Sequence, residues 1–400
     1  MTSPASPPET RDARHDDPRT TARELARQLA ATARARDVAG GTPLAERRMI
    51  RESGLLAIGI PTACGGGGAS WRTVLQVVQI IAAADASLAQ VYGFQHVLLA
   101  TCQLFGTPEQ SRRLLEATAA QRWFWGNALN PLDRRLALVA TPSGRVLRGD
   151  KSFSTGALDS DMMIISALED GTGKLIVAAI PTARPGVELH DDWHNMGQRQ
   201  TDSGSSRFHD VVVRDEEILG PPGPFGSTFS TLRPCIPQLV FTHVYLGIAD
   251  AALAAARDYV RTRTRPWFST KHESNTQDPY VLAHFGEMVA ALAGAQAVAD
   301  RAGETLDRAW QRGDALTVDE RGALAVEVAT AKLLASRAVL DLTTQMFDVT
   351  GAGATGSTWG FDRFWRNART LTLHDRLDYK VHDLGQWYLN DQWPTPSFYS

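Results

Sequence analysis

The stretch Arg363-Phe-Trp-Arg-Asn-Ala-Arg369-Thr-Leu-Thr-Leu-His374-Asp375 packs three arginines, two large aromatic residues, a histidine and a carboxylate into thirteen residues. It follows a glycine-rich run, Gly351-Ala-Gly-Ala-Thr-Gly-Ser357, that predicts a loop. Large aromatic side chains between arginines indicate a surface that a ligand or a partner covers. Taken alone, this pattern favours an amphipathic helix at a subunit interface; a second segment, Asp150-Lys-Ser-Phe-Ser-Thr-Gly156, favours a ligand site.

Length and composition limit the class of protein. A chain of 400 residues exceeds one comfortable core, so two or three subdomains are expected. A net charge of −3 argues against a nucleic-acid partner. The cysteines Cys64, Cys102 and Cys235 are too scattered for a disulfide framework or a metal site. We expect no membrane-spanning apolar run and no signal peptide, and therefore a cytoplasmic protein.

The periodicity changes twice along the chain. Helical patterns prevail up to about Arg122, and short apolar runs separated by tight turns then predict strands until the Pro/Gly-rich linker that ends at Gly226. Helices return after that linker. We therefore predict an α+β chain with a disordered tail (1–18), an N-terminal helical domain (19–122), a central antiparallel β-barrel or sandwich (123–226) and a C-terminal four-helix bundle with an interface tail (227–400).

Helix boundaries are signalled locally. Thr107 followed by a proline predicts an N-cap, and Thr317 with Glu320 predicts a capping box. Gly351 is expected to end the second of these helices. Its predicted buried stripe is rich in small residues that permit close packing: Val328, Ala331, Ala335, Ala338, Leu342 and Met346.

Four motifs in this order resemble segments of the acyl-CoA dehydrogenase superfamily, along nearly the whole chain. They are Ile60-Pro61 with Gly65-Gly66, Gly126-Asn127-Ala128-Leu129-Asn130-Pro131, Lys151-Ser-Phe153-Ser-Thr155-Gly156, and Asn195-Met-Gly197-Gln-Arg199. The chain departs from the dehydrogenases where they carry a glutamate base, since it has Leu373-His374-Asp375-Arg376 there. This departure resembles the reduced-flavin monooxygenase branch, which includes dibenzothiophene monooxygenase and the sulfur-acquisition oxidoreductases.

The resemblance implies a two-component enzyme. A separate flavin reductase would supply reduced FMN, with FAD as the alternative, and O2 would react with it to form a C4a-hydroperoxide. That species would oxygenate a small apolar or aromatic substrate, and sulfur-containing compounds are among the candidates. The protein would exclude water and place a few donors around the ring.

The same resemblance nominates catalytic residues. Thr155 would donate a hydrogen bond from a strand, beside Phe153 as a wall of the flavin ring. Asn127 or Asn130, with Leu129 between them, would lie along the flavin, and the choice between the two amides stays open. His374 would stabilise the peroxide or carry a proton, because imidazole titrates near neutral pH.

Further residues are nominated for the phosphate and the substrate. The phosphate would be bound by Arg263 or Arg265 of a neighbouring subunit. Gly353 replaces an arginine that relatives often carry, and the backbone N–H groups of its loop could still bind the phosphate. His96, Trp193 and Asp375 are candidates for the substrate pocket, with a structural role as the alternative for His96 and Trp193. No metal is expected.

Two rival functions remain. One is an acyl-CoA dehydrogenase with Asp375 as its base, although an aspartate is one methylene shorter than a glutamate. The other is a non-catalytic helical scaffold. The aromatic tail Trp387-Tyr-Leu-Asn-Asp-Gln-Trp393-Pro-Thr-Pro-Ser-Phe-Tyr399 predicts an interface, and the resemblance implies a homotetramer.

Overall fold

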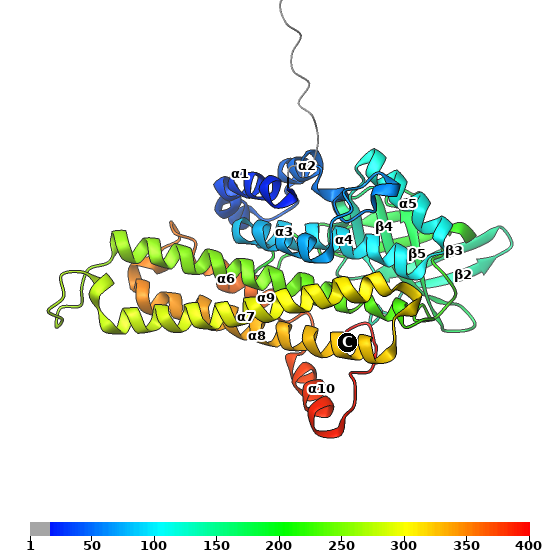
Figure 1. Ribbon diagram of the computed structural model, residues 1–400. Coiled ribbons are helices and arrows are strands. Elements are labelled where there is room, and N and C mark those ends of the chain that lie inside the picture. Colours follow the sequence, from blue (N-terminus) through cyan, green and yellow to red (C-terminus); the bar gives the residue numbers. More distant parts are fainter. Residues whose placement is uncertain (1–16) are drawn as a thin grey trace, which may run out of the picture.

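The computed structural model describes residues 17–400, and its elements follow the predicted order of helices, sheet and helices (Figure 1). Most of the tail expected to be disordered, residues 1–16, lies outside the described part of the chain. The first helix begins at Pro18, within the predicted tail, with Asp17 as its N-cap. The N-terminal helices are α1 (Pro18–Ala39), α2 (Leu44–Glu52), α3 (Trp71–Ala84), α4 (Ala86–Phe105) and α5 (Pro108–Gln121).

Local signals set the helix ends that the sequence predicted. Thr107 caps α5, and its side chain forms a capping box with Gln110. Thr317 and Glu320 form the same arrangement at the start of α8 (Val318–Thr350). Gly351 follows that helix with φ of 74°, a value that costs little only for glycine. These three predictions are confirmed.

The central domain is one seven-stranded sheet in the order β1-β4-β2-β3-β7-β6, with β5 also paired to β4. The predicted apolar runs separated by tight turns form two antiparallel hairpins, β2–β3 and β4–β5. The expectation of a purely antiparallel sheet was wrong, because β4 pairs in parallel with both β1 and β2. The strands are β1 (Trp125–Ala128), β2 (Ala137–Thr141), β3 (Gly144–Lys151), β4 (Met162–Glu169), β5 (Leu175–Pro181), β6 (Val187–Leu189) and β7 (Ser206–Val213).

Long helices build the C-terminal domain and run side by side away from the sheet in Figure 1. α6 packs against α8, α7 and α3, and α10 packs on α8. The predicted small-residue stripe of α8 is buried, which lets its neighbours approach closely. In chain order the helices are α6 (Cys235–Arg263), α7 (Pro279–Arg312), α8, α9 (Asp362–Leu371) and α10 (Leu377–Asn390).

Two of these helices correct the expectation that no apolar run reaches membrane-spanning length. Phe229–Arg263 and Pro279–Ala315 are long and apolar enough to cross a bilayer by length and composition alone. The apolar window of the first is 72% buried, so core packing accounts for its composition. The window of the second is only 17% buried, which leaves much apolar surface of α7 uncovered in the single chain.

Two hydrophobic cores cover the two faces of the sheet. Ile164 and Val177 belong to the larger core, which continues through the helical domains. Their chain neighbours Met163, Ile165 and Ala178 belong to the smaller core inside the sheet. Successive strand residues point to opposite faces, so β4 and β5 are buried on both sides. This packing holds the ends of the neighbouring strands rigidly against the helices.

Candidate active site

A cavity of about 910 Å³, here called the interdomain cleft, opens where the sheet meets α4 and the end of α9. It brings together side chains that are far apart in the sequence, Thr155 and His374 among them. The nominated residues Asn127, Leu129, Asn130, Phe153 and Trp193 also line it. The structure therefore places the main nominated groups around one space.

Thr155 lies in the turn that follows β3, and not on a strand as expected, because β3 ends at Lys151. Its hydroxyl lies 2.8 Å from the hydroxyl of Ser203, and its carbonyl accepts a hydrogen bond from the backbone of Asn127 at 2.9 Å. Phe153 adopts φ of 60° in the same turn. The turn is therefore tied both to β1 and to the loop before β7, and this fixes the direction of the Thr155 hydroxyl.

The two candidate asparagines differ in their surroundings. Asn127 is buried on β1, and its Oδ1 accepts from the backbone of Leu129 at 3.2 Å. Asn130 lies beyond the end of β1, in a turn, and its Oδ1 accepts from the backbone of Leu132 at 3.2 Å. Both carbonyl oxygens are engaged by backbone N–H groups, so each amide directs its NH2 group away from its own turn.

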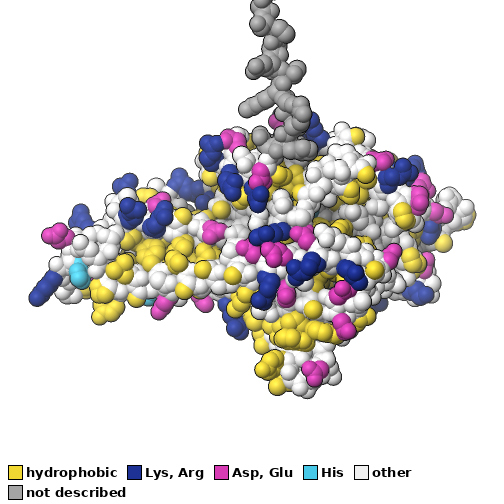
Figure 2. All heavy atoms as spheres, viewed as in Figure 1, with side chains coloured by type: hydrophobic (Ala, Val, Ile, Leu, Met, Phe, Trp, Pro, Cys, Tyr) yellow, Lys and Arg dark blue, Asp and Glu magenta, His cyan; other side chains and the backbone are white. Residues whose placement is uncertain are grey.

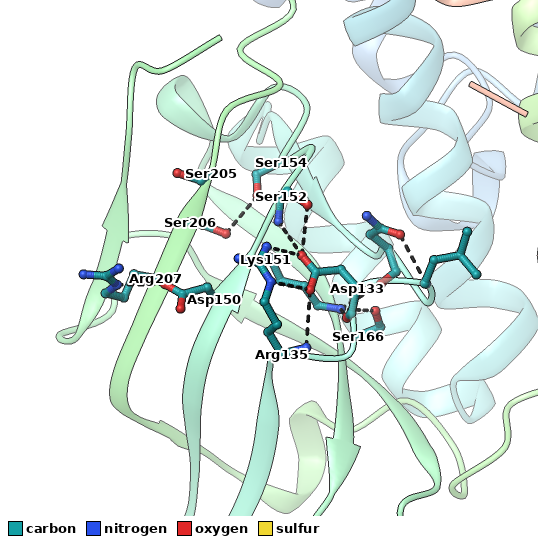
Figure 3. Close-up of polar contacts among 12 residues, drawn as sticks. Asp133, Arg135, Asp150, Lys151, Ser152, Ser154, Ser166, Ser205, Ser206 and Arg207 are labelled. Carbon is teal, nitrogen blue, oxygen red and sulfur yellow. Dashed lines mark hydrogen bonds and ion pairs between the residues drawn. The ribbon is translucent and has the colours of Figure 1, made fainter. Parts of the chain in front are cut away.

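A polar network beneath the cleft holds these turns in place (Figure 3). Lys151 donates to the carbonyls of Asn130 and Asp133 at 2.8 and 2.6 Å. The Asp133 carboxylate accepts from Ser152 and from Arg135. Burial lowers the pKa of the Lys151 ammonium to about 8. Burial alone would raise the pKa of Asp133, but hydrogen bonds from Arg135 and Ser152 outweigh it and hold that pKa below its usual range.

Aromatic rings form one wall of the cleft. The Phe153 and Trp193 rings meet edge to face, with centroids 6.0 Å apart and planes at 72°. The indole N–H of Trp193 donates to the carbonyl of Gln198 at 2.7 Å, which fixes its orientation. Phe153 keeps 57% of its surface exposed, and it faces the open cleft. Such a wall suits a flat ring.

His374 lies just beyond α9 on the other side. Its ring centroid is 4.5 Å from that of Phe241 and 5.9 Å from that of Tyr399. Nδ1 lies 3.2 Å from Oδ1 of Asp375. Burial lowers the pKa of His374, and the hydrogen bond to Asp375 opposes this only in part. The imidazole is therefore neutral at pH 7 and can accept or donate a proton.

Asp375 does not line the interdomain cleft; it lines an adjoining cavity of about 510 Å³. Its carboxylate forms an ion pair with Lys332 of α8. Burial would raise its pKa, but the contacts with His374 and Lys332 outweigh burial and keep the pKa below its usual range. A substrate contact of Asp375 is not supported, because the side chain turns back toward α8.

His96 also lies outside the cleft. It lines a separate cavity of about 390 Å³ with Val74 and Trp310. Gln90 and Phe94 of the same helix line the interdomain cleft. His96 follows Phe94 by two residues, which is about 200° around an α-helix, so it faces the opposite side. Burial lowers its pKa to about 3, as expected for the structural alternative.

The residues nominated for the phosphate do not line the cleft of the same chain. The Arg263 guanidinium lies 5.6 Å from the centre of the Trp359 ring. Neither Arg265 nor Gly353 lines the cleft. A Cβ atom on Gly353 would lie 2.8 Å from the hydroxyl of Tyr259, so a larger residue there would require that side chain to shift. A contact with a flavin in a neighbouring subunit stays a prediction.

Three buried polar atoms of the cleft have no hydrogen-bond partner within residues 17–400: Gln90 Oε1, Gln198 Oε1 and Thr370 Oγ1. Buried polar groups are nearly always paired, so these atoms are available to accept hydrogen bonds from a molecule bound in the cleft. None of them was predicted. A glutamine inside the strongly apolar helix α4 was the one available signal, because such residues are rarely buried without a role.

A flavin fits this arrangement. Its isoalloxazine ring is flat, and one edge alternates N–H donors with carbonyl acceptors. The unpaired oxygens of Gln90 and Gln198 can accept from such an edge, and the amide of Asn127 can donate to it. No lysine or arginine of the described chain lines the cleft.

The fold and the cleft define a class of enzymes with a central sheet between two helical domains, and the walls of the cleft suit a flat heteroaromatic cofactor. The chain belongs to the acyl-CoA dehydrogenase family. The family's N-terminal domain model matches residues 12–122 of the chain, its middle domain model matches residues 135–211, and its C-terminal domain model matches residues 239–379.

Three monooxygenases are similar to the chain over nearly its whole length. A probable FMNH2-dependent monooxygenase, SfnC from Pseudomonas putida, is 51% identical over 95% of this chain and 96% of its own length. The structure of methanesulfinate monooxygenase MsuC from Pseudomonas fluorescens has a TM-score of 0.94 and 50% identity, and covers 96% of this chain and 100% of its own. FMN-bound TdsC from Paenibacillus sp. A11-2, a dibenzothiophene monooxygenase, has a TM-score of 0.92 and 43% identity with coverages of 96% and 100%.

Proposed function

We propose that the protein is a flavin-dependent monooxygenase that uses reduced FMN and O2 to oxygenate a small organosulfur substrate. One observation carries the proposal: Thr155 and His374 line one cleft, whose unpaired oxygens and aromatic wall fit a flavin ring. The relatives support the same chemistry, since SfnC is named as FMNH2-dependent and TdsC binds FMN. MsuC and TdsC are named for sulfur compounds.

Bound reduced FMN supplies the electrons for oxygen activation, and the protein prepares the surroundings. The Thr155 hydroxyl, held by Ser203, lines the cleft from the sheet side and would donate a hydrogen bond to the ring. Phe153 and Trp193 would cover the ring and exclude water. The neutral His374 imidazole gives or takes a proton on the other side of the cleft. These assignments of roles are proposals.

The dehydrogenase alternative lacks its base. Abstraction of an α-proton needs a carboxylate within hydrogen-bond distance of the substrate. Asp375 lies outside the interdomain cleft and forms an ion pair with Lys332. No other carboxylate of the described chain lines the cleft except that of Asp133, which is held by Ser152 and Arg135.

The test compares two reactions with one protein preparation. Reduced FMN from an added flavin reductase is supplied with O2 and, in turn, a sulfide, a sulfone and a sulfinate. We expect one 18O atom from 18O2 in the product, with the second oxygen atom released as water. In parallel, an acyl-CoA is offered with an artificial electron acceptor. Acyl-CoA oxidation without oxygen transfer to any sulfur compound would overturn the proposal.

A reductase partner and a homotetramer complete the proposal. Figure 2 shows hydrophobic side chains gathered over α10, where Tyr379, Val381, Tyr388 and Leu389 are exposed. Exposed apolar patches of this kind suit subunit contacts. Light scattering of the purified protein should give four times the chain mass of 43.5 kDa, and a monomeric mass would contradict the tetramer. A cytoplasmic location also stays a prediction.

A further inference from the structure

A buried charge pair lies directly behind His374. The Lys332 side chain on α8 is fully buried, and its ammonium contacts Asp375 Oδ1 and Gln238 Oε1. The ring of Phe241 lies 5.5 Å from the same ammonium. Asp375 Oδ1 is also the atom 3.2 Å from Nδ1 of His374. One carboxylate oxygen therefore connects a lysine of α8 to the imidazole that lines the cleft.

We infer that Lys332 and Asp375 are positioning residues that set the tautomer and the basicity of His374. A carboxylate only accepts hydrogen bonds, so Nδ1 of the neutral ring carries the proton in this contact. Nε2 then keeps its lone pair, and no group within residues 17–400 donates to it. The inference rests on the role proposed for His374 in the preceding subsection.

The two charges act on His374 in opposite directions. A neighbouring carboxylate favours the imidazolium and raises the pKa of a histidine, whereas a neighbouring ammonium lowers it. Together they orient the ring without adding net charge to the cleft. Burial lowers the pKa of Lys332 to about 8, against the pull of Asp375, so the ammonium is still largely protonated at pH 7.

The remaining charges nearby come from other elements. Arg233, just before α6, also acts on His374 and lowers its pKa. Asp375 in turn raises the pKa of Lys380 of α10 and that of the Tyr399 phenol. The variants below leave all three unchanged, so a shift in the pKa of His374 is attributable to Lys332 or Asp375.

The experiment measures the pKa of His374 in the flavin-free protein. Diethyl pyrocarbonate modifies neutral imidazole, and mass spectrometry of the peptide that contains His374 gives the rate at each pH. We expect the pKa to rise by about 1 unit in Lys332→Met and to fall by about 1 unit in Asp375→Asn. Lys332→Arg should stay near the wild type. Lys174→Met, in the exposed turn before β5, is the matched control and should show no shift.

Enzyme activity supplies the second measurement. The acid limb of the kcat/KM profile should move with the pKa of His374 in each variant, while the KM for reduced FMN stays within about twofold. Shifts in the same direction for both variants, or none in proteins with wild-type circular dichroism, would overturn the inference. If Lys332→Met does not fold, Lys332→Arg and Asp375→Asn carry the test. A wild type without monooxygenase activity refutes the proposed function, yet the modification rates still test the pair.

Discussion

Replacing Gly197 with alanine should loosen the wall of the interdomain cleft. Gly197 belongs to the loop between β6 and β7, and it packs directly against the backbone of α9. A Cβ atom there would lie 2.1 Å from the carbonyl oxygen of Arg366 and 2.4 Å from its carbonyl carbon. Ordinary contacts begin near 3.4 Å, so the loop and the helix must separate by about 1 Å. Neither neighbour is a flexible side chain that can turn aside.

The energetic cost follows from two contributions. Overpacking of this kind costs about 1–3 kcal/mol. The separation also strains the hydrogen bond from the backbone of Gln198 to Asn367 Oδ1, which is buried and 2.7 Å long. A buried donor that loses its partner costs about 1–3 kcal/mol more. We therefore expect a loss of about 2–6 kcal/mol and a fall in Tm on the order of 5 °C.

Thermal unfolding followed by circular dichroism measures the loss of stability. Titration with reduced FMN under anaerobic conditions measures the flavin affinity of the cleft. Gly286→Ala is the matched control, because a Cβ atom at that position of α7 meets nothing within 4 Å. Alanine inside a helix should stabilise the control by about 0.5–1 kcal/mol. If Gly197→Ala has the same Tm and the same flavin affinity as the wild type, the described contact between the loop and α9 is refuted.

Three further predictions concern single side chains. Thr155→Val removes the hydroxyl at nearly constant volume, and kcat should fall at least about tenfold while Thr155→Ser restores most of it; an unchanged kcat in steady-state assays would exclude Thr155 as a donor. Burial lowers the pKa of both His96 and His243 to about 3. As the pH falls, these histidines are therefore protonated first in the unfolded chain. The free energy of unfolding should fall between pH 6.5 and 3 by up to about 1.4 kcal/mol per pH unit for each ring. Urea titrations should find a smaller pH dependence in His96→Phe. Arg47 is fully buried and lies 2.5 Å from the buried carboxylate of Asp202; Arg47→Met should cost about 3–5 kcal/mol in urea unfolding, with Asp202→Asn in the same background recovering part of the loss.

Much of the architecture could be predicted because its signals are local. The capping box at Thr317 and the glycine stop at Gly351 act within a few residues of the helix ends that they define. The β4–β5 hairpin likewise follows from a turn between two apolar runs. The parallel pairing of β4 with β1 and β2 escaped prediction, because strand partners distant in sequence leave no mark on either strand.

The candidate site was only partly predictable for the same reason. Motif resemblance pointed to Thr155 and His374. His96, a weaker candidate for which a structural role was the favoured alternative, lines another cavity because of its position around α4. It placed Asp375 in the substrate pocket, where the structure has an ion pair with Lys332. Gln90, whose carbonyl oxygen is buried without a partner, was missed altogether.

By itself, the sequence determined the order of helical, sheet and helical domains, the principal helix ends and the family to which the chain belongs. Only the tertiary structure decided which helix faces line the cleft and which charged side chains lie next to the His374 imidazole. Hydrophobic periodicity and capping depend on neighbours along the chain, whereas a site depends on contacts between segments that packing alone brings together. Lys332 and His374 are an example, since neither residue's sequence neighbours predict the other.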